Sequence, residues 1–217
     1  MKKIASPLFQ DLSEAELDTL AAAGHLRTRQ FAKHEVIFHA GSCVREIGIV
    51  LRGSVHIENL DLWGTKSILS SVGAGQAFAE TYAFCGEALM VDAVAAEHCE
   101  ILFLHTAALT DARIEPALQD KLLRRLLAVS MRKNLSLSQR IFCTTPKTVR
   151  GRLLTYFSAQ AARSGSLQFE IPFNRQQLAD YLNVDRSAMS NELGKMQKDR
   201  MIEVDRKHFR ILGEMEI

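Results

Sequence analysis

Residues 174–199 read NRQQLADYLNVDRSAMSNELGKMQKD, and this stretch decides the fold of the C-terminal part of the chain. Its apolar side chains stand where two short helices must pack at a steep angle, as in a helix-turn-helix. Ala179 is small enough for a close crossing, and Asn183 falls at the tight turn, where a left-handed backbone favours glycine or asparagine. Asn174 and Asp185 are placed to cap the two helices. The apolar positions are Leu178, Leu182, Val184, Met189 and Leu193.

The second of these helices is expected to begin at Arg186 and to expose polar side chains on its first turns. That part of a recognition helix reaches base edges in the major groove. Arginine bonds guanine and asparagine bonds adenine in two-point contacts, so the sequence predicts double-stranded DNA as a partner. The expected base readers are Arg186, Ser187, Ser190 and Asn191, and the expected phosphate contacts, which position without specifying sequence, are Asn174, Gln176 and Lys195.

Flanking elements complete this C-terminal unit. Residues 201–204 and 209–212, joined by the polar turn 205–208, predict a hairpin, the wing of a winged helix-turn-helix. Residues 147–163 predict an amphipathic helix that ends at Ser164-Gly165-Ser166. Its inward side chains are expected to be Val149, Leu153, Leu154 and Phe157.

The chain from about residue 28 to residue 106 has a different pattern, in which short apolar runs alternate with glycine. Runs such as EIGIVLRGSVHIE, residues 46–58, and CEILFLH, residues 99–105, predict strands of a small antiparallel barrel or roll. Glycine suits the corners of such a roll because φ is often positive there. The corner glycines are expected to be Gly41, Gly53, Gly64, Gly73 and Gly75.

Residues 114–142 predict one long helix, since they contain no glycine and only Pro116, near the start. This helix carries two apolar stripes. One of them, Leu122, Leu126 and Val129, is expected to pack the helix on the roll. A helix with two apolar faces needs two partners, so we favour a homodimer over a helix buried within one chain. The other stripe is the expected dimer seam, and its positions are spaced alternately by four and three residues as in a coiled coil. They are Leu123, Leu127, Ser130, Asn134, Leu137 and Ile141.

The sequence Thr144-Thr145-Pro146 ends the helical pattern, because the residue before a proline is pushed out of the helical region. We therefore expect two domains, residues 1–145 with the long helix and residues 146–217. The second domain holds 12 Lys and Arg against 9 Asp and Glu, whereas the first holds 15 against 16. Clustered positive charge generates phosphate affinity, so the basic balance agrees with DNA binding in residues 146–217.

Several other classes of protein lack their sequence signals. No window approaches 18 consecutive apolar residues and the N-terminus is polar, so we expect a cytoplasmic protein with no membrane contact. No motif of a catalytic triad, phosphate loop or nucleophilic cysteine occurs, so we expect no enzyme activity and no cofactor. No CxxC pair or HxH occurs, which argues against a metal site and a cupin-type enzyme. The four cysteines are Cys43, Cys85, Cys99 and Cys143.

A roll, a long helix and a winged helix-turn-helix, in this order, resemble the Crp/Fnr family of bacterial regulators over nearly the whole chain. The most specific matches are residues 176–199 and the segment GAGQAFAE, residues 73–80. The resemblance implies an α+β fold: an antiparallel, jelly-roll-like β-roll as a cyclic-nucleotide-binding-like sensor domain, a long dimerisation helix and a winged helix-turn-helix. It also implies a homodimer that binds a palindromic operator. Activation of transcription would need a surface that contacts RNA polymerase, and residues 163–168 are the candidate by position. In the recognition helix Ser187 and Asn191 replace the glutamate and arginine of the best-known members, so a different operator is expected.

By the same resemblance, residues 73–94 occupy the place of the family's phosphate-binding cassette, and Glu80 matches the acidic residue that holds the ribose. Ten residues later, Met90 and Val91 replace the arginine and small hydroxyl residue that grip a cyclic phosphate. An apolar pair leaves a buried phosphate charge unpaired, so we expect a small-molecule effector other than cyclic AMP. A structural carboxylate at a turn is the alternative for Glu80. The expected effector residues are Glu80, Tyr82, Phe84, Met90, Val91, Ser130, Lys133 and Asn134.

Two alternatives remain open for the function: a sensor that acts on a protein partner, and a redox-responsive regulator that works through a cysteine. The oxygen-sensing members of the family gather cysteines near the N-terminus, and none here precedes Cys43. Haem sensing would need a placed axial ligand, and the histidines are scattered. They are His25, His34, His39, His56, His98, His105 and His208.

Overall fold

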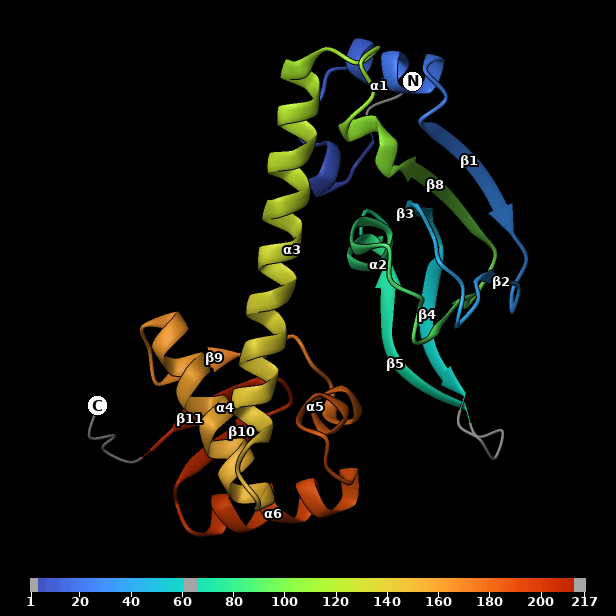
Figure 1. The fold of residues 1–217 in the computed structure, drawn as a ribbon. Coiled ribbons are helices and arrows are strands. Elements are labelled where there is room, and N and C mark those ends of the chain that lie inside the picture. The colour runs from blue at the N-terminus through green and yellow to red at the C-terminus, as the bar shows by residue number, and fades with distance from the viewer. Residues whose placement is uncertain (1–3, 61–65, 213–217) are drawn as a thin grey trace. The chain divides into compact units, whose positions relative to one another are not determined.

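The computed structural model of the protein describes residues 4–60 and 66–212 and confirms the expected α+β fold (Figure 1). The chain divides into two compact units, residues 1–132 and 133–217. This division falls inside the long helix, because the last turn of that helix packs into the core of the second unit through Cys143. The sequence-based division at residue 146 keeps the whole helix with the first domain. Within the described residues, no helix has the length and apolar character needed to cross a membrane.

The first unit is a roll made of two antiparallel sheets. One sheet has the order β1-β8-β3-β6 and the other the order β2-β7-β4-β5. Two short 3-10 helices, Pro7–Phe9 and Thr106–Leu109, and the helices α1, Glu14–Ala22, and α2, Glu80–Cys85, accompany the sheets. The strands are β1 Leu26–Phe31, β2 Val36–Phe38, β3 Glu46–Arg52, β4 Ser54–Leu60, β5 Lys66–Gly73, β6 Ala77–Phe78, β7 Asp92–Ala95 and β8 Cys99–His105.

Strand β8 is buried on both faces, which explains its unbroken apolar run. Ile101 and Phe103 belong to the core between the two sheets, while Leu102 and Leu104 belong to a second core together with residues of α1 and α3. Alternate side chains of a strand point to opposite faces, so one strand serves both cores. The second core includes Leu122 and Leu126, which confirms that this stripe of the long helix packs on the roll; Val129 is half-buried.

The corner glycines agree only partly with expectation. Gly41, Gly53 and Gly75 have φ values of 80°, 84° and 82°. A side chain at Gly53 would also meet the carbonyl oxygen of His98, 2.6 Å from its Cβ. Gly73 ends strand β5 and so lies at a corner as expected, but its φ is not positive. Gly64 lies outside the described residues.

The long helix α3 spans Pro116–Thr144, two residues later at each end than the sequence pattern predicts. The Ile114 amide instead donates to the Asp111 carbonyl oxygen, 2.9 Å away, and so belongs to a turn before the helix. The helix starts at Pro116. At the other end the Thr144 and Thr145 hydroxyls donate to carbonyls of the preceding turn, at 2.9 and 2.8 Å, and stabilise it up to the residues before Pro146.

The second unit packs three helices on a small sheet of order β10-β11-β9. Strands β10 and β11 form the expected hairpin, in which Asp205 pairs with His208. The third strand, β9, was not expected: residues 168–170 are too few for a period of two to be recognised. The elements are α4 Val149–Ser164, β9 Gln168–Glu170, α5 Arg175–Leu182, α6 Arg186–Lys198, β10 Ile202–Asp205 and β11 His208–Ile211.

Helix α4 begins two residues later than predicted because the Thr148 side chain accepts from the Gly151 amide, 3.0 Å away, and caps it. Leu153 and Phe157 are buried as expected, and Val149 is half-buried. Leu154 was wrongly expected to face inward and is 36% exposed. The core-facing positions are Leu153, Tyr156, Phe157 and Ala161, which follow the three-and-four spacing of a helix.

Candidate nucleic-acid interface

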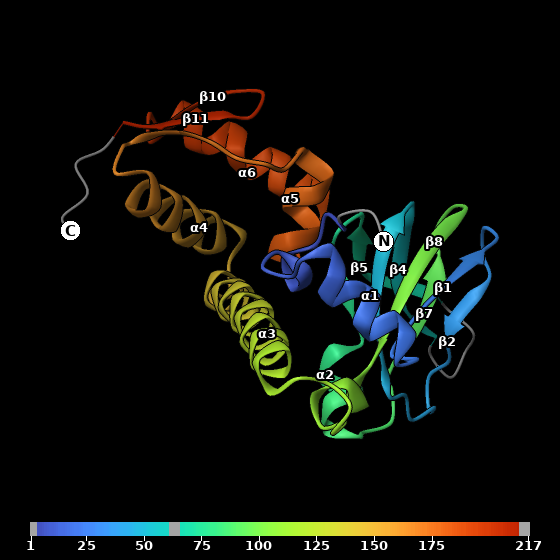
Figure 2. The same ribbon diagram turned by 90° about the horizontal axis from the view of Figure 1, so that it is seen from above.

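Helices α5 and α6 form the helix-turn-helix with the local geometry that the sequence predicts. Asn174 and Gln177 form a capping box at the start of α5, and the Asp185 carboxylate accepts from the Ala188 amide, 2.8 Å away, at the start of α6. Asn183 ends α5 with φ at 53°, in the left-handed region. Figure 2 shows α6 beside α5 and the β10–β11 hairpin, as in a winged helix-turn-helix.

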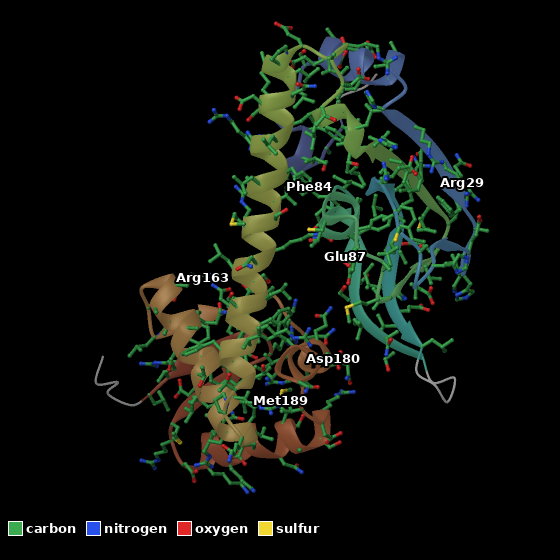
Figure 3. All side chains as sticks on the ribbon, viewed as in Figure 1. Arg29, Phe84, Glu87, Arg163, Asp180 and Met189 are labelled. Carbon is green, nitrogen blue, oxygen red and sulfur yellow. The ribbon has the colours of Figure 1, made fainter. Side chains whose placement is uncertain are left out.

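Helical spacing gives α6 one buried side and one polar, exposed side. Met189, whose place is labelled in Figure 3, lies in the core with Leu193 and Met196. Arg186 makes no ion pair with any residue in the described part of the chain, so its guanidinium is available to a guanine. The exposed side carries all four predicted base readers, Arg186, Ser187, Ser190 and Asn191.

The three predicted phosphate contacts are also exposed, but each already has a partner inside the unit. The Asn174 side chain caps α5, and Gln176 Nε2 donates to Asp180 Oδ1 at 2.8 Å. Lys195 Nζ lies 3.8 Å from Glu192 Oε2. A DNA phosphate must therefore compete with Asp180 and Glu192 for Gln176 and Lys195.

Arginine side chains on the two helices before α5 contact the helix-turn-helix. The sequence pattern did not predict these contacts. Arg150 on α4 pairs with Glu192 on α6, and its Nη2 donates to Asp199 Oδ2 at 2.9 Å. These two carboxylates raise the pKa of the Arg150 guanidinium. The partners lie 42 and 49 residues away in sequence, so no local pattern signals them.

A second group of contacts holds the turn between α5 and α6. Arg140 on α3 donates to the main-chain oxygens of Tyr181 and Asp180, at 3.1 and 3.0 Å. Arg152 on α4 donates to the main-chain oxygens of Leu182 and Asn183, at 3.0 and 2.7 Å. Cations near the carboxyl end of a helix are favourable because the helix dipole is negative there. The turn is thus fixed by residues of both preceding helices.

Arg175, the first residue of α5, connects the helix-turn-helix to the wing, which is the β10–β11 hairpin. Its guanidinium lies over the Phe209 ring on β11, 5.4 Å from the centroid. Burial lowers the pKa of this guanidinium, and its Nη1 has no hydrogen-bond partner in the described structure. A cation over an aromatic face is attracted by the ring quadrupole, so this contact positions α5 against the sheet.

In the first unit, α2 and α3 enclose a groove of about 230 Å³. Phe84 lies on α2 and lines this groove (Figure 3). Three of the predicted effector residues, Glu80, Phe84 and Ser130, meet here. Glu80 is buried at the start of α2, and the preceding Ala79 is held at φ 63°, a conformation that costs a non-glycine residue free energy. The groove is lined by Glu80, Thr81, Phe84, Cys85, Leu123, Leu126, Leu127 and Ser130.

Comparison with known protein families agrees with this architecture. Residues 28–113 match the model of the cyclic nucleotide-binding domain, and residues 151–215 match the model of the Crp-like helix-turn-helix domain. The strands of the roll, apart from the first two residues of β1, lie in the first range, and the helix-turn-helix formed by α5 and α6 lies in the second. The chain belongs to the Crp/Fnr family. It is therefore a DNA-binding transcription regulator, which is a class of proteins without enzymatic activity.

This Crp/Fnr regulator is similar to the transcriptional activator protein FnrA of Stutzerimonas stutzeri, with 24% identity over 200 residues that cover 87% of this chain and 78% of that protein. Two solved structures share its fold. The c-di-GMP responsive regulator CLP of Xanthomonas campestris has 18% identity and a TM-score of 0.55, over 93% of this chain and all of that chain. CprK complexed with OCPA has 11% identity and a TM-score of 0.65, over 93% of this chain and 90% of that chain.

The other predicted effector residues of this Crp/Fnr regulator do not line the groove. Met90 is 77% exposed, so it is not the apolar wall that was expected, because the segment between α2 and β7 leaves it on the surface. Tyr82 and Val91 are half-buried. Lys133 and Asn134 are exposed on α3 and belong to the second compact unit.

The cysteines of the regulator are all free, with Cys43 and Cys85 exposed and Cys99 and Cys143 buried. Burial raises the pKa of the Cys143 thiol, which disfavours the thiolate needed for redox reactivity. The Cys99 thiol donates to the Ser54 carbonyl oxygen at 3.0 Å. Nothing in the surroundings of these two buried cysteines favours a redox role.

Proposed function

We propose that this Crp/Fnr regulator acts in the cytoplasm as a homodimer on a palindromic operator, under the control of a small-molecule effector other than cyclic AMP. The observation that carries the proposal is the apolar seam along α3. Its large members are exposed on the single chain, and Leu127 is 56% exposed. Soluble proteins rarely leave so extended an apolar surface uncovered. The exposed members are Leu123, Leu127, Leu137 and Ile141.

A second copy of the same helix is the natural occupant of this seam. The spacing of four and three residues lets two such helices interlock along their length. Ser130 and Asn134 interrupt the apolar positions, and polar groups at seam positions select one register of pairing. Two copies related by a two-fold axis present two recognition helices, which matches a palindrome with half-sites about one DNA turn apart.

The effector is proposed to bind in the groove between α2 and α3. Leu123 and Leu127 line this groove and also belong to the seam, so a bound molecule would touch residues that pair the two chains. The lining carries no arginine or lysine to neutralise a cyclic phosphate. RNA polymerase is a proposed partner, through residues 163–168.

Sedimentation at micromolar concentration tests the dimer. The wild type is expected to sediment as a dimer, and Leu127→Asp and Leu137→Asp as monomers, because each places a charge in the seam. Leu167→Asp is the control, since Leu167 is a similarly exposed leucine outside α3. A monomeric wild type would refute the proposal.

Random-site selection of bound DNA, with and without a cell metabolite extract, tests the operator and the effector together. Two inverted half-sites with centres about 10 base pairs apart are expected. A single unpaired half-site would contradict the proposed symmetry. Any response to the extract is expected to disappear in Phe84→Ala and to persist in Met90→Ala, because only Phe84 lines the groove.

A further inference from the structure

The second unit contains a small cavity, separate from the groove between α2 and α3, where the end of α3 meets α4 and α5. Its volume is about 110 Å³. An apolar cavity of about 150 Å³ accepts benzene, so this one takes a molecule smaller than a benzene ring. The cavity is lined by Gln139, Phe142, Cys143, Tyr156, Ala159, Gln160, Arg163 and Tyr181.

One of the residues that line the cavity carries a buried hydroxyl group that needs a partner. Tyr156 is only 2% exposed, and its hydroxyl makes no hydrogen bond with any residue that the structure describes. A buried hydroxyl without a partner is unfavourable because it has lost its hydrogen bonds to water without replacing them. The ring is held in place by Phe157 and Tyr181, whose ring centroids lie 5.9 and 5.6 Å away. Burial raises the pKa of Tyr156, so the hydroxyl keeps its proton and can donate it.

The charged groups that line the cavity determine whether it favours an anion or a cation. Arg163, in the last turn of α4 (Figure 3), is the one cation among the lining residues, and its charge acts on the phenols of Tyr156 and Tyr181. The lining contains no aspartate or glutamate. Cys143 stays a neutral thiol because burial raises its pKa. The cavity therefore favours an anion and disfavours a cation.

The uncharged lining residues indicate which other chemical groups an occupant would carry. Phe142 and Tyr181 offer aromatic surface, while Gln139 and Gln160 carry side-chain amides that can donate to or accept from an occupant. A carboxylate accepts two bonds from one guanidinium and has lone pairs left for a hydroxyl donor. A short carbon chain then lies against the rings and remains within the available volume.

We propose that this cavity binds a short-chain carboxylate of two to four carbon atoms, whose oxygens accept hydrogen bonds from the Tyr156 hydroxyl and the Arg163 guanidinium. The occupant touches α3, α4 and α5 in one unit. This site is additional to the effector groove of the proposed function, and it does not require a dimer.

Calorimetric titration of the full-length protein with sodium propionate tests the site, with propionamide as the uncharged molecule of the same shape. Propionate is expected to bind one site per chain with a dissociation constant in the millimolar range. Propionamide is expected to bind at least about tenfold more weakly, because it cannot form the charge-assisted bonds. Sodium chloride at equal ionic strength serves as the blank.

Three variants locate the binding. Tyr156→Phe keeps the ring and removes only the hydroxyl, and Arg163→Gln removes the cation at the surface; each is expected to weaken propionate binding about tenfold or more. Lys147→Gln, an exposed cation outside the cavity, is expected to bind as the wild type does. If Tyr156→Phe does not fold, Arg163→Gln gives the result.

Three outcomes would each overturn the proposal. They are no saturable binding by the wild type, equal binding of propionate and propionamide, and unchanged binding in the folded variants. The first would mean that the cavity holds water only. The second or third would mean that propionate binds elsewhere or without recognition of its charge.

Discussion

Arg152 on α4 donates from Nη1 to the main-chain oxygen of Asn183, 2.7 Å away, and so holds the left-handed turn of the helix-turn-helix from outside the motif. The same guanidinium donates to the carbonyl oxygens of Leu182 and Pro146, at 3.0 and 2.8 Å. One side chain therefore joins the hinge before α4 to the turn before α6.

Replacing Arg152 with alanine is expected to lower the free energy of unfolding of the second unit by about 1–3 kcal/mol, because three carbonyl groups lose a charged donor. Urea denaturation followed by circular dichroism measures the change. Arg152→Lys should recover only part of it, since an ammonium lacks the planar fork. An unchanged midpoint in Arg152→Ala, relative to a Lys147→Ala control, would show that these bonds do not hold the turn.

Asn183 itself is expected to tolerate glycine and to reject alanine. Its φ of 53° is accessible to glycine without strain, whereas alanine pays about 1–2 kcal/mol in the left-handed region. Thermal denaturation of Asn183→Gly and Asn183→Ala should therefore rank the glycine variant above the alanine variant. Equal melting temperatures would mean that the turn relaxes to another conformation.

The two kinds of DNA contact are expected to separate in binding assays. Arg186→Ala should relax the preference at one base pair of each half-site, with a cost of about 1–3 kcal/mol for the preferred base. Lys195→Ala should weaken binding to all sequences alike and reduce the salt slope by about one. Fluorescence anisotropy over a range of salt concentrations measures both effects. Uniform weakening by Arg186→Ala would identify Arg186 as a phosphate contact.

Asp111 is expected to make the stability of the first unit depend on pH. The pKa of the Asp111 carboxyl lies far below its usual 3.8, mainly because Arg113 donates hydrogen bonds to it. His25 Nε2, which lies 2.7 Å from Asp111 Oδ2, lowers this pKa further. The folded state thus favours the carboxylate, so its stabilising effect is complete above about pH 4 and is lost as the pH falls further, through the folded pKa.

Asp111→Asn should accordingly unfold at a lower urea concentration than the wild type at pH 7, and the difference should shrink as the pH falls below about 4. Asp120→Asn, which alters an exposed carboxylate paired with Arg124, is the matched control. A difference between wild type and Asp111→Asn that stays constant down to pH 3 would rule out this ionisation as the cause.

Local elements were predictable because their signals lie within a few residues. The caps at Asn174 and Asp185 and the turn at Asn183 each depend on the next three or four positions. The errors arose where a neighbour far along the chain decided the outcome. Leu154 fits the helical pattern, but the core of the second unit accepts Tyr156 instead. Met90 is apolar, yet the path of the chain leaves it exposed.

The sequence by itself determined the order of roll, long helix and winged helix-turn-helix, as well as which side of α6 is polar, since helix period and capping are properties of short segments. Only the tertiary structure decided which distant side chains meet. Arg152 reaches Asn183 across 31 residues and Arg150 reaches Glu192 across 42. The cavity around Tyr156 likewise exists only where three helices converge. Such contacts depend on how packed elements place their side chains in space, and linear spacing does not contain that information.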